Sequence, residues 1–197
     1  MLAVAPAMAD TYTNGPINGT SDGWTINFGF TVSDSFTLAS NDTAVTSFHF
    51  NYWDASATDV LTTADLQLGT TSFGGTNNPG LAFTSTFLGT NQFGYNLFQA
   101  DATGLSIPWV SGAGYATLGN ACTTSGCSVS TPIYWDENSG SSTAYENTIG
   151  SIPSESFTIS GTAGTVPPPG TPEPSSIMLF GSGILGLAGV LRRKLTR

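Results

Sequence analysis

Val45-Thr-Ser-Phe-His-Phe-Asn-Tyr-Trp53 is the stretch that decides the fold. Within it, the aromatic residues Phe48, Phe50 and Tyr52 alternate with polar ones, and a period of two is typical of a strand with one buried face. We therefore predict an amphipathic strand in which Phe48, Phe50 and Tyr52 point inward. The opposite set is expected to point outward: Ser47, His49, Asn51 and Trp53.

A second stretch, from Trp24 to Val32, alternates in the same way and follows two turn-forming pairs, Asn14-Gly15 and Asn18-Gly19. It predicts another long strand, with one face formed by Trp24, Ile26, Phe28, Phe30 and Val32.

The rest of residues 10–160 contains short strand-like segments flanked by Gly, Asn, Pro or Ser, and no window with a helical period. The segments are 35–39, 65–68, 81–88, 92–99, 105–110, 114–118, 131–135 and 155–160. This pattern predicts an all-β domain, an antiparallel two-sheet sandwich of jelly-roll-like type with about nine or ten strands.

Charge is distributed very unevenly along the 197 residues, of which only 9% are charged. All four basic residues lie at or after Arg192, so the preceding 191 residues carry all 13 acidic groups and no lysine or arginine. Such a body has no cations with which to neutralise phosphate, which disfavours nucleic acid and anionic lipid surfaces as partners.

The C-terminal tail has the composition of a short membrane helix. Ile177 to Leu191 is uncharged, and at ~1.5 Å per residue it would reach roughly 22 Å, which local bilayer thinning can accommodate. The cluster Arg192, Arg193 and Lys194 is expected to stay cytoplasmic as a stop signal, leaving residues 1–176 outside. Residues 161–171, rich in Gly, Thr and Pro, are expected to form a linker.

The order of parts in residues 172–197 resembles the PEP-CTERM sorting signal of Gram-negative bacteria: Pro172-Glu173-Pro174, the apolar segment from Ile177, then the basic stop. The resemblance implies that exosortase, a membrane protease-transpeptidase, recognises Pro172, Glu173 and Pro174 and removes the helix. The alternative is a permanent one-helix anchor. The body is similar to those of other exported PEP-CTERM proteins through residues 24–30, 134–140 and 152–157, which implies a shared sandwich and adds no site.

The beginning of the chain fits export as well. Ala7-Met8-Ala9 matches the small-x-small cleavage pattern of a signal peptide, although residues 1–9 contain no basic region. We expect these nine residues to be the remnant of a signal peptide whose start lies upstream, with the mature chain beginning near Asp10. In an exported protein the only two cysteines, Cys122 and Cys127, are expected to form a short-loop disulfide.

A polar and aromatic constellation runs from Tyr134 to Asn138. One interpretation is carbohydrate recognition, in which Trp53 or Trp135 stacks on a sugar while Asp136 and Asn138 bond its hydroxyls. The other, which we prefer for this segment, places Trp135 in the core and a turn at residues 136–140.

Other candidate chemistry is sparse. Asp54, Asp59 and Asp65 flank one loop and are candidates for Ca²⁺ ligation, although solvated loop carboxylates are the default and no cofactor or metal is expected. His49, the sole histidine, is expected to be a surface residue because no catalytic triad pattern accompanies it.

Three functions follow, in order of preference. The first is a non-enzymatic structural or adhesive protein of the cell surface or extracellular polysaccharide matrix. The second is a carbohydrate-binding module of the exopolysaccharide. The third is a glycoside hydrolase, which would need two carboxylates facing each other across a cleft.

Overall fold

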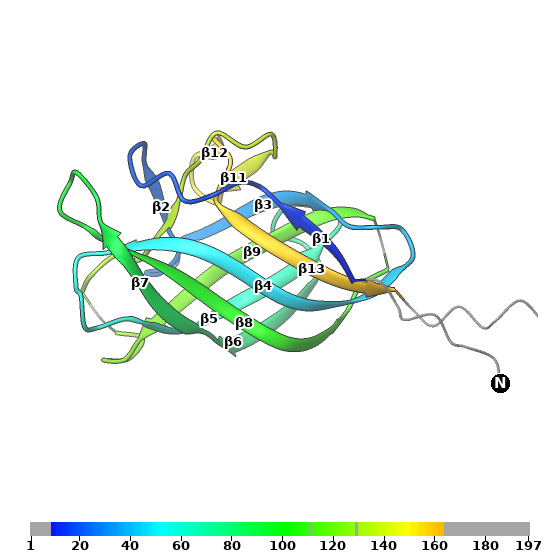
Figure 1. Ribbon diagram of the computed structural model, residues 1–197, viewed down its shortest axis with the longest axis horizontal. Helices are drawn as coiled ribbons and strands as arrows, with labels where there is room; N and C mark the ends of the chain where they lie inside the picture. Colours follow the sequence, from blue (N-terminus) through cyan, green and yellow to red (C-terminus); the bar gives the residue numbers. More distant parts are fainter. Residues whose placement is uncertain (1–8, 111, 129, 164–197) are drawn as a thin grey trace, which may run out of the picture. The chain divides into compact units, whose positions relative to one another are not determined.

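The computed structural model describes residues 9–110, 112–128 and 130–163, and within them every regular element is a β-strand. Thirteen strands form two antiparallel sheets, one of seven strands and one of six (Figure 1). This confirms the prediction of an all-β fold with two antiparallel sheets. The finer jelly-roll connectivity stays a prediction.

The seven-stranded sheet is built on β4 (Asp42–Asp54), the strand that contains the opening stretch. β8 (Asn96–Pro108) pairs along β4 from Ala44 to Asp54. The other edge of β4 is shared, since β13 pairs with residues 42–50 and β10 with residues 52–53. The remaining bounds in this sheet are β1 Ala9–Thr13, β2 Gly23–Thr25, β7 Thr84–Thr90, β10 Tyr134–Asp136 and β13 Phe157–Ala163.

The six-stranded sheet has the order β12-β11-β3-β9-β5-β6. Its central pairs join β9 to β3 and to β5 along most of their lengths. Its bounds are β3 Thr31–Thr37, β5 Leu61–Gly69, β6 Thr76–Ala82, β9 Ala113–Thr123, β11 Ala144–Glu146 and β12 Gly150–Ile152.

The core between the sheets is aromatic on the β4 side. Phe48, Phe50 and Tyr52 are each at most 1% exposed, which confirms the inward face predicted for this strand. Trp135 packs edge-on against Phe50 and Phe157, with ring centroids 5.8 and 5.7 Å apart. Complete burial of each such side chain contributes roughly 1.5–3 kcal/mol to the free energy of unfolding, so this cluster is a main source of stability.

The long strand predicted from Trp24 to Val32 is wrong. β2 ends at Thr25 and β3 begins at Thr31, and between them the chain turns through Phe28 and Gly29, whose φ angles are 57° and 87°. The side chain of the buried Asn27 holds this turn by donating to the Thr131 carbonyl and accepting from the Ile133 amide. Consequently Phe28 and Phe30 are 51% and 38% exposed instead of facing the core.

The strand count of nine or ten is also wrong, because several pairings are only three residues long. β11 and β12 are examples of strands with too few residues to show a period. No helix among the described residues has the length and apolarity needed to cross a membrane. The helix predicted for residues 177–191 lies outside the described residues.

Candidate functional site

An aromatic cleft lies at the end of the seven-stranded sheet where β4 finishes. It has a volume of about 350 Å³ and is lined by Ser21, Asp22, Gly23, Trp53, Phe93, Tyr95 and Tyr134. We call these seven residues the aromatic cleft. Four of the seven are aromatic, which distinguishes the cleft from the hydroxyl-lined hollow described below.

Two of the rings come from paired strands and two from a turn. Trp53 and Tyr134 are direct register partners of β4 and β10. Phe93 and Tyr95 lie on the turn that joins β7 to β8, and the rings of both approach Trp53, with centroids 6.0 and 6.1 Å away. Tyr95 in turn packs edge-on against Tyr134 at 5.6 Å. The rings therefore form one continuous apolar surface.

The turn that carries Phe93 is tightly held. The carboxamide oxygen of Asn91 accepts hydrogen bonds from the amides of Phe93 and Tyr95, at 3.0 and 2.9 Å. The Asn91 amide donates to the Tyr95 carbonyl, and Gln92 donates to the Thr20 carbonyl on the other side of the cleft. These hydrogen bonds hold the backbone of the turn, and the exposed Phe93 ring stacks on Trp53.

Asp136 organises the floor of the cleft without lining it. This carboxylate is fully buried and accepts hydrogen bonds from Trp53 Nε1 at 2.5 Å and from the amides of Asn18 and Gly19 at 2.7 and 2.8 Å. Burial raises the pKa of Asp136, and these hydrogen bonds oppose the rise. Asp136 therefore fixes the indole of Trp53 and the loop before Asp22 relative to each other.

Gly23 has no side chain, which leaves the space beside Trp53 and Tyr134 open. A Cβ added there would lie 2.9 Å from Cβ of Tyr134 and 3.6 Å from the indole of Trp53. Any larger side chain would have to displace the aromatic floor. The glycine therefore keeps the space above Trp53 and Tyr134 open.

Of the residues proposed from sequence to contact a glycan, only Trp53 reaches the cleft. It faces outward as the alternation predicts, but the loops on either side leave it only 5% exposed. The stacking role for Trp135 is wrong, since this side chain is fully buried and its Nε1 donates to the Ser156 carbonyl. The preferred interpretation of Trp135 as core is confirmed.

The prediction that Asp136 and Asn138 form hydrogen bonds with a sugar ligand is also wrong. Asp136 is committed to the contacts above, and Asn138 is 7% exposed and donates to the Asn14 carbonyl. The cleft residues overlooked in the sequence are Phe93 and Tyr95. Their signal was present in Asn91-Gln-Phe-Gly-Tyr95, where aromatic residues stand inside a turn-forming segment and have no strand partner to bury them.

A second unusual region, which we call the buried acid pair, consists of Asp34 and Glu155. Both are 0% exposed. Asp34 accepts hydrogen bonds from the amides of Ser35 and Glu155, at 2.6 and 2.7 Å, and from the side chains of Ser142 and Asn14, at 2.8 and 3.2 Å. Burial nevertheless raises the pKa of Asp34 to about 6.

Glu155 is less well compensated than Asp34. Neither of its carboxyl oxygens has a hydrogen-bond partner among the described residues. Burial, followed by the nearby charge of Asp34, raises the pKa of Glu155 well above its ordinary value. Without a lysine or arginine anywhere before Arg192, the body has no strong cation with which to pair this group.

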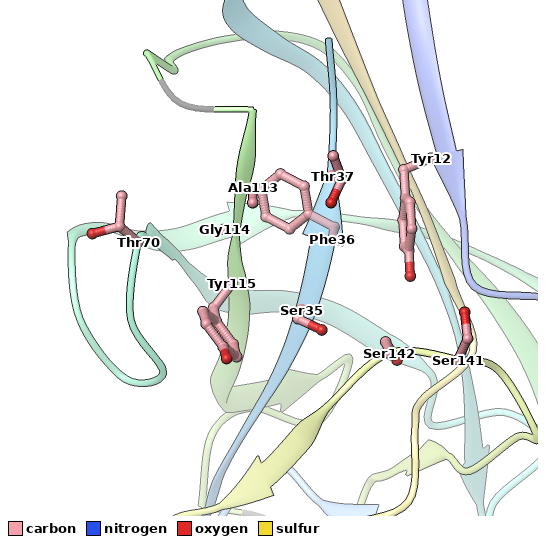
Figure 2. A pocket seen from close by; sticks show the side chains of 10 residues that line it. All are labelled: Tyr12, Ser35, Phe36, Thr37, Thr70, Ala113, Gly114, Tyr115, Ser141 and Ser142. Atoms are coloured by element: carbon pink, nitrogen blue, oxygen red, sulfur yellow. The ribbon is translucent and has the colours of Figure 1, made fainter. Parts of the chain in front are cut away.

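A hydroxyl-lined hollow of about 380 Å³ lies beside this network (Figure 2). Tyr12, Ser35 and Ser142 line one part of it, and Thr70 and Tyr115 another. Its lining contains hydroxyls but no carboxylate or imidazole, so it lacks the acid and base groups that hydrolysis would need. We assign no chemistry to it.

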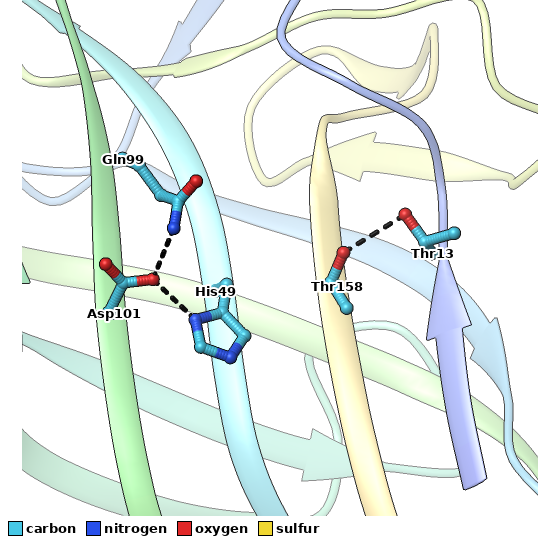
Figure 3. A network of polar contacts seen from close by, with 5 residues as sticks. All are labelled: Thr13, His49, Gln99, Asp101 and Thr158. Atoms are coloured by element: carbon cyan, nitrogen blue, oxygen red, sulfur yellow. Dashed lines mark hydrogen bonds and ion pairs between the residues drawn. The ribbon is translucent and has the colours of Figure 1, made fainter. Parts of the chain in front are cut away.

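His49 lies on the outer face of the seven-stranded sheet (Figure 3). Its Nδ1 is 2.5 Å from Oδ1 of Asp101, which also accepts a hydrogen bond from Gln99 at 2.6 Å. Thr158, the register partner of His49 on β13, donates its hydroxyl to Thr13. With 29% of its side chain exposed, His49 is the partly exposed surface residue that the sequence predicts.

The three aspartates proposed for Ca²⁺ do not gather. No group of three or more His, Cys, Asp or Glu side chains among the described residues could hold a metal ion. Asp59 accepts hydrogen bonds from the Thr124 hydroxyl and the Ser125 amide, and Asp65 accepts hydrogen bonds from the Asn120 side chain and the Gly80 amide. Burial raises the pKa of Asp54 to about 6. The Ca²⁺ interpretation therefore has no support from their geometry.

The predicted disulfide is confirmed. Cys122 and Cys127 are bonded, and the segment between them turns back so that Thr123 pairs with Gly126. The cross-link therefore closes the turn that follows β9, an interior strand of the six-stranded sheet.

The described residues thus form an acidic all-β domain of two antiparallel sheets, with one disulfide that closes a turn. The family model of the PEP-CTERM protein-sorting motif matches residues 170–194, so the chain carries this motif and is a PEP-CTERM protein. The motif implies export and membrane-associated sorting, and exosortase is the enzyme that recognises such signals. The matched residues lie outside the described part of the structure. No curated protein matches the chain significantly.

Proposed function

We propose that this chain is a non-enzymatic structural or adhesive protein that exosortase sorts to the cell surface or extracellular matrix of a Gram-negative bacterium. The observation that carries the proposal is the match of residues 170–194 to the sorting motif. In this proposal Pro172, Glu173 and Pro174 are the recognition element. Residues 177–191 form the transient membrane helix, with Arg192, Arg193 and Lys194 on its cytoplasmic side.

The charge distribution supports the same conclusion. Every lysine and arginine lies at or after Arg192, while the sandwich that precedes it is acidic. Positive residues beside an apolar segment oppose translocation, whereas an acidic, cation-free body does not. An exported body also accounts for the disulfide, because such bonds persist outside the reducing cytosol.

The body supports a non-enzymatic role through the environment of its acids. Asp34, Asp54 and Glu155, whose pKa values are strongly raised, are buried and are not among the residues that line the aromatic cleft. A glycoside hydrolase requires two carboxylates on opposite sides of a substrate cleft. The aromatic cleft has one, Asp22.

The test is the fate of a Glu173→Gln variant in cells that contain exosortase, with Ser175→Ala as the matched control. We expect the unaltered chain and the control to lose the tail and leave the inner membrane. The Glu173→Gln variant is expected to stay full-length in the membrane fraction. Equal processing of all three proteins would overturn the role of the motif, and retention of all three would indicate a permanent anchor.

A further inference from the structure

The aromatic cleft combines one exposed ring with three other aromatic side chains around a hollow. Phe93 is 54% exposed although it stacks on the buried Trp53. Full burial of an aromatic side chain is worth roughly 1.5–3 kcal/mol, so a ligand that covers Phe93 would gain part of that free energy. We propose that the cleft is a saccharide-binding site for a hexopyranose chain that carries no negative charge.

The size of the cleft fits a sugar better than a protein surface. Its volume of about 350 Å³ lies at the lower end of the range of about 300–1,000 Å³ that is typical of small-molecule sites. That space matches one or two sugar units and is too small for a folded partner. The competing occupant is a second copy of the chain, packed through Phe93, and the experiment below distinguishes it.

The chemistry of the lining matches the two-sided character of a pyranose ring. The C–H faces of a sugar are apolar and pack against aromatic rings, while its edge carries hydroxyls. In the cleft the exposed ring of Phe93, stacked on Trp53, supplies most of the apolar surface. The side chains of Ser21, Asp22 and Tyr134 supply hydroxyl and carboxylate groups at its margin.

Charge selects among sugars. Asp22 is the charged group that lines the cleft, and no lysine or arginine occurs before Arg192. Glu137 lies nearby and accepts a hydrogen bond from Trp24 Nε1. Uronic acid or phosphorylated polymers would therefore meet only like charge, whereas neutral chains are tolerated and amino sugars are attracted.

The site is already formed without a ligand. The Asn91 hydrogen bonds hold Phe93, and Asp136 holds Trp53 and the loop before Asp22. Ordering of a binding loop would otherwise lower affinity, so a fixed arrangement favours binding.

This proposal deepens the proposed adhesive role and rests on it for the presence of polysaccharide around the protein. Its test uses the purified full-length chain in mild detergent, where sorting has no influence. A failure to bind sugar would leave the Glu173 result untouched. A failure of processing would likewise leave the binding result valid.

The experiment measures binding of three hexamers by titration calorimetry: a β-1,4-linked glucose hexamer, a β-1,4-linked glucosamine hexamer and a galacturonate hexamer. We expect the first two to bind and the third to bind at least about tenfold more weakly. Phe93→Ala is expected to weaken binding of the first two about tenfold through loss of the stacked ring.

The matched control is Phe87→Ala, because Phe87 has the same exposed fraction of 54% but lies on β7 outside the cleft. It should change affinity less than about twofold. Absence of binding to the neutral and cationic hexamers, equal binding of the galacturonate hexamer, or equal effects of the two alanine variants would overturn the proposal. So would a dimer on gel filtration that Phe93→Ala dissociates.

Asp22→Asn separates stacking from charge. It should lower affinity for the glucosamine hexamer several-fold while leaving the glucose hexamer within about twofold. Equal loss for both hexamers would contradict the charge selection proposed for Asp22.

Discussion

The aromatic cleft and the buried acid pair are opposite departures from the usual distribution of residues. The first keeps an aromatic ring, Phe93, 54% exposed, whereas the second keeps two carboxyl groups, Asp34 and Glu155, 0% exposed. The cleft rings face a hollow that a ligand can enter. The acids face donors of their own chain or, in Glu155, no partner among the described residues.

The contrast indicates that the aromatic cleft serves binding, whereas the buried acid pair affects the stability of the fold. Perturbed carboxyls are often taken as signs of a catalytic site, yet burial inside the sandwich is the largest cause of both shifts, and the charge of Asp34 adds to the shift of Glu155. An exposed ring affects the folded state little but is available to a partner. We therefore expect changes in the acid pair to act on the free energy of unfolding, and changes in the cleft to act on binding.

The largest effect is expected for Asp34→Ala. The substitution leaves buried donors on Ser35, Asn14, Ser142 and Glu155 without their acceptor, and each such loss costs about 1–3 kcal/mol. We expect the free energy of unfolding to fall by about 3–5 kcal/mol in urea titrations at pH 4.5. The exposed cleft carboxylate supplies the control, Asp22→Ala, with a change near 0.5 kcal/mol. Equal losses would remove the distinction between the regions.

The next effect is a loss of stability as pH rises. The pKa of Asp34 is about 6 in the folded protein and 3.8 ordinarily, so its stabilising protonation is complete below 3.8 and is lost as pH rises through about 6. At about 1.4 kcal/mol per pKa unit, this lowers the free energy of unfolding by roughly 2–2.5 kcal/mol between pH 4 and pH 7. The raised pKa of Glu155 acts in the same direction.

Urea titrations across this pH range measure the slope directly. Asp34→Asn removes one titrating group and should make the profile shallower, while Glu155 and Asp54, whose pKa values are also raised, keep part of the slope. Asp59 and Asp65, whose pKa values are lowered, act in the opposite direction below pH 3.8, outside this range. A protein that becomes more stable from pH 4 to pH 7 would contradict the account of the acid pair.

The smallest effect on stability is expected for Phe93→Ala. Because the ring is more than half exposed, its removal should lower the free energy of unfolding by less than about 1 kcal/mol. Phe98, only 2% exposed at the start of β8, provides the contrast, since Phe98→Ala should cost about 3–5 kcal/mol. Comparable thermal unfolding losses in the two variants would mean that Phe93 is a structural residue.

Two segments show the same alternation of apolar and polar residues, but the strand predicted from it was correct in only one of them. For β4 the alternation predicted the inward aromatic face correctly, because β4 is paired along nearly all its length by β8 on one edge and by β13 and β10 on the other. For residues 24–32 the same pattern failed, because the turn at Phe28 depends on Asn27 contacting Thr131 and Ile133, more than 100 residues away. The alternation of neighbouring residues cannot predict a contact with residues so distant in the chain.

The candidate site was harder to predict than the sheets. Trp135 and Phe93 look alike in sequence, since both stand among Asn, Gly and acidic or amide residues. Only pairing decides between them: Trp135 lies on β10, which pairs with β4 and β2, while Phe93 lies on the turn between β7 and β8. The C-terminal motif and the disulfide, in contrast, were predictable because each depends on residues close together in the chain.

The most direct test of the account is the intact mass of the unaltered protein recovered from the medium of cells that contain exosortase. The account predicts a mature chain that ends before Ile177 and is two hydrogens lighter than its reduced form, because Cys122 and Cys127 are bonded. A recovered mass that includes residues 177–197, or a body that remains in the cytosol, would contradict it.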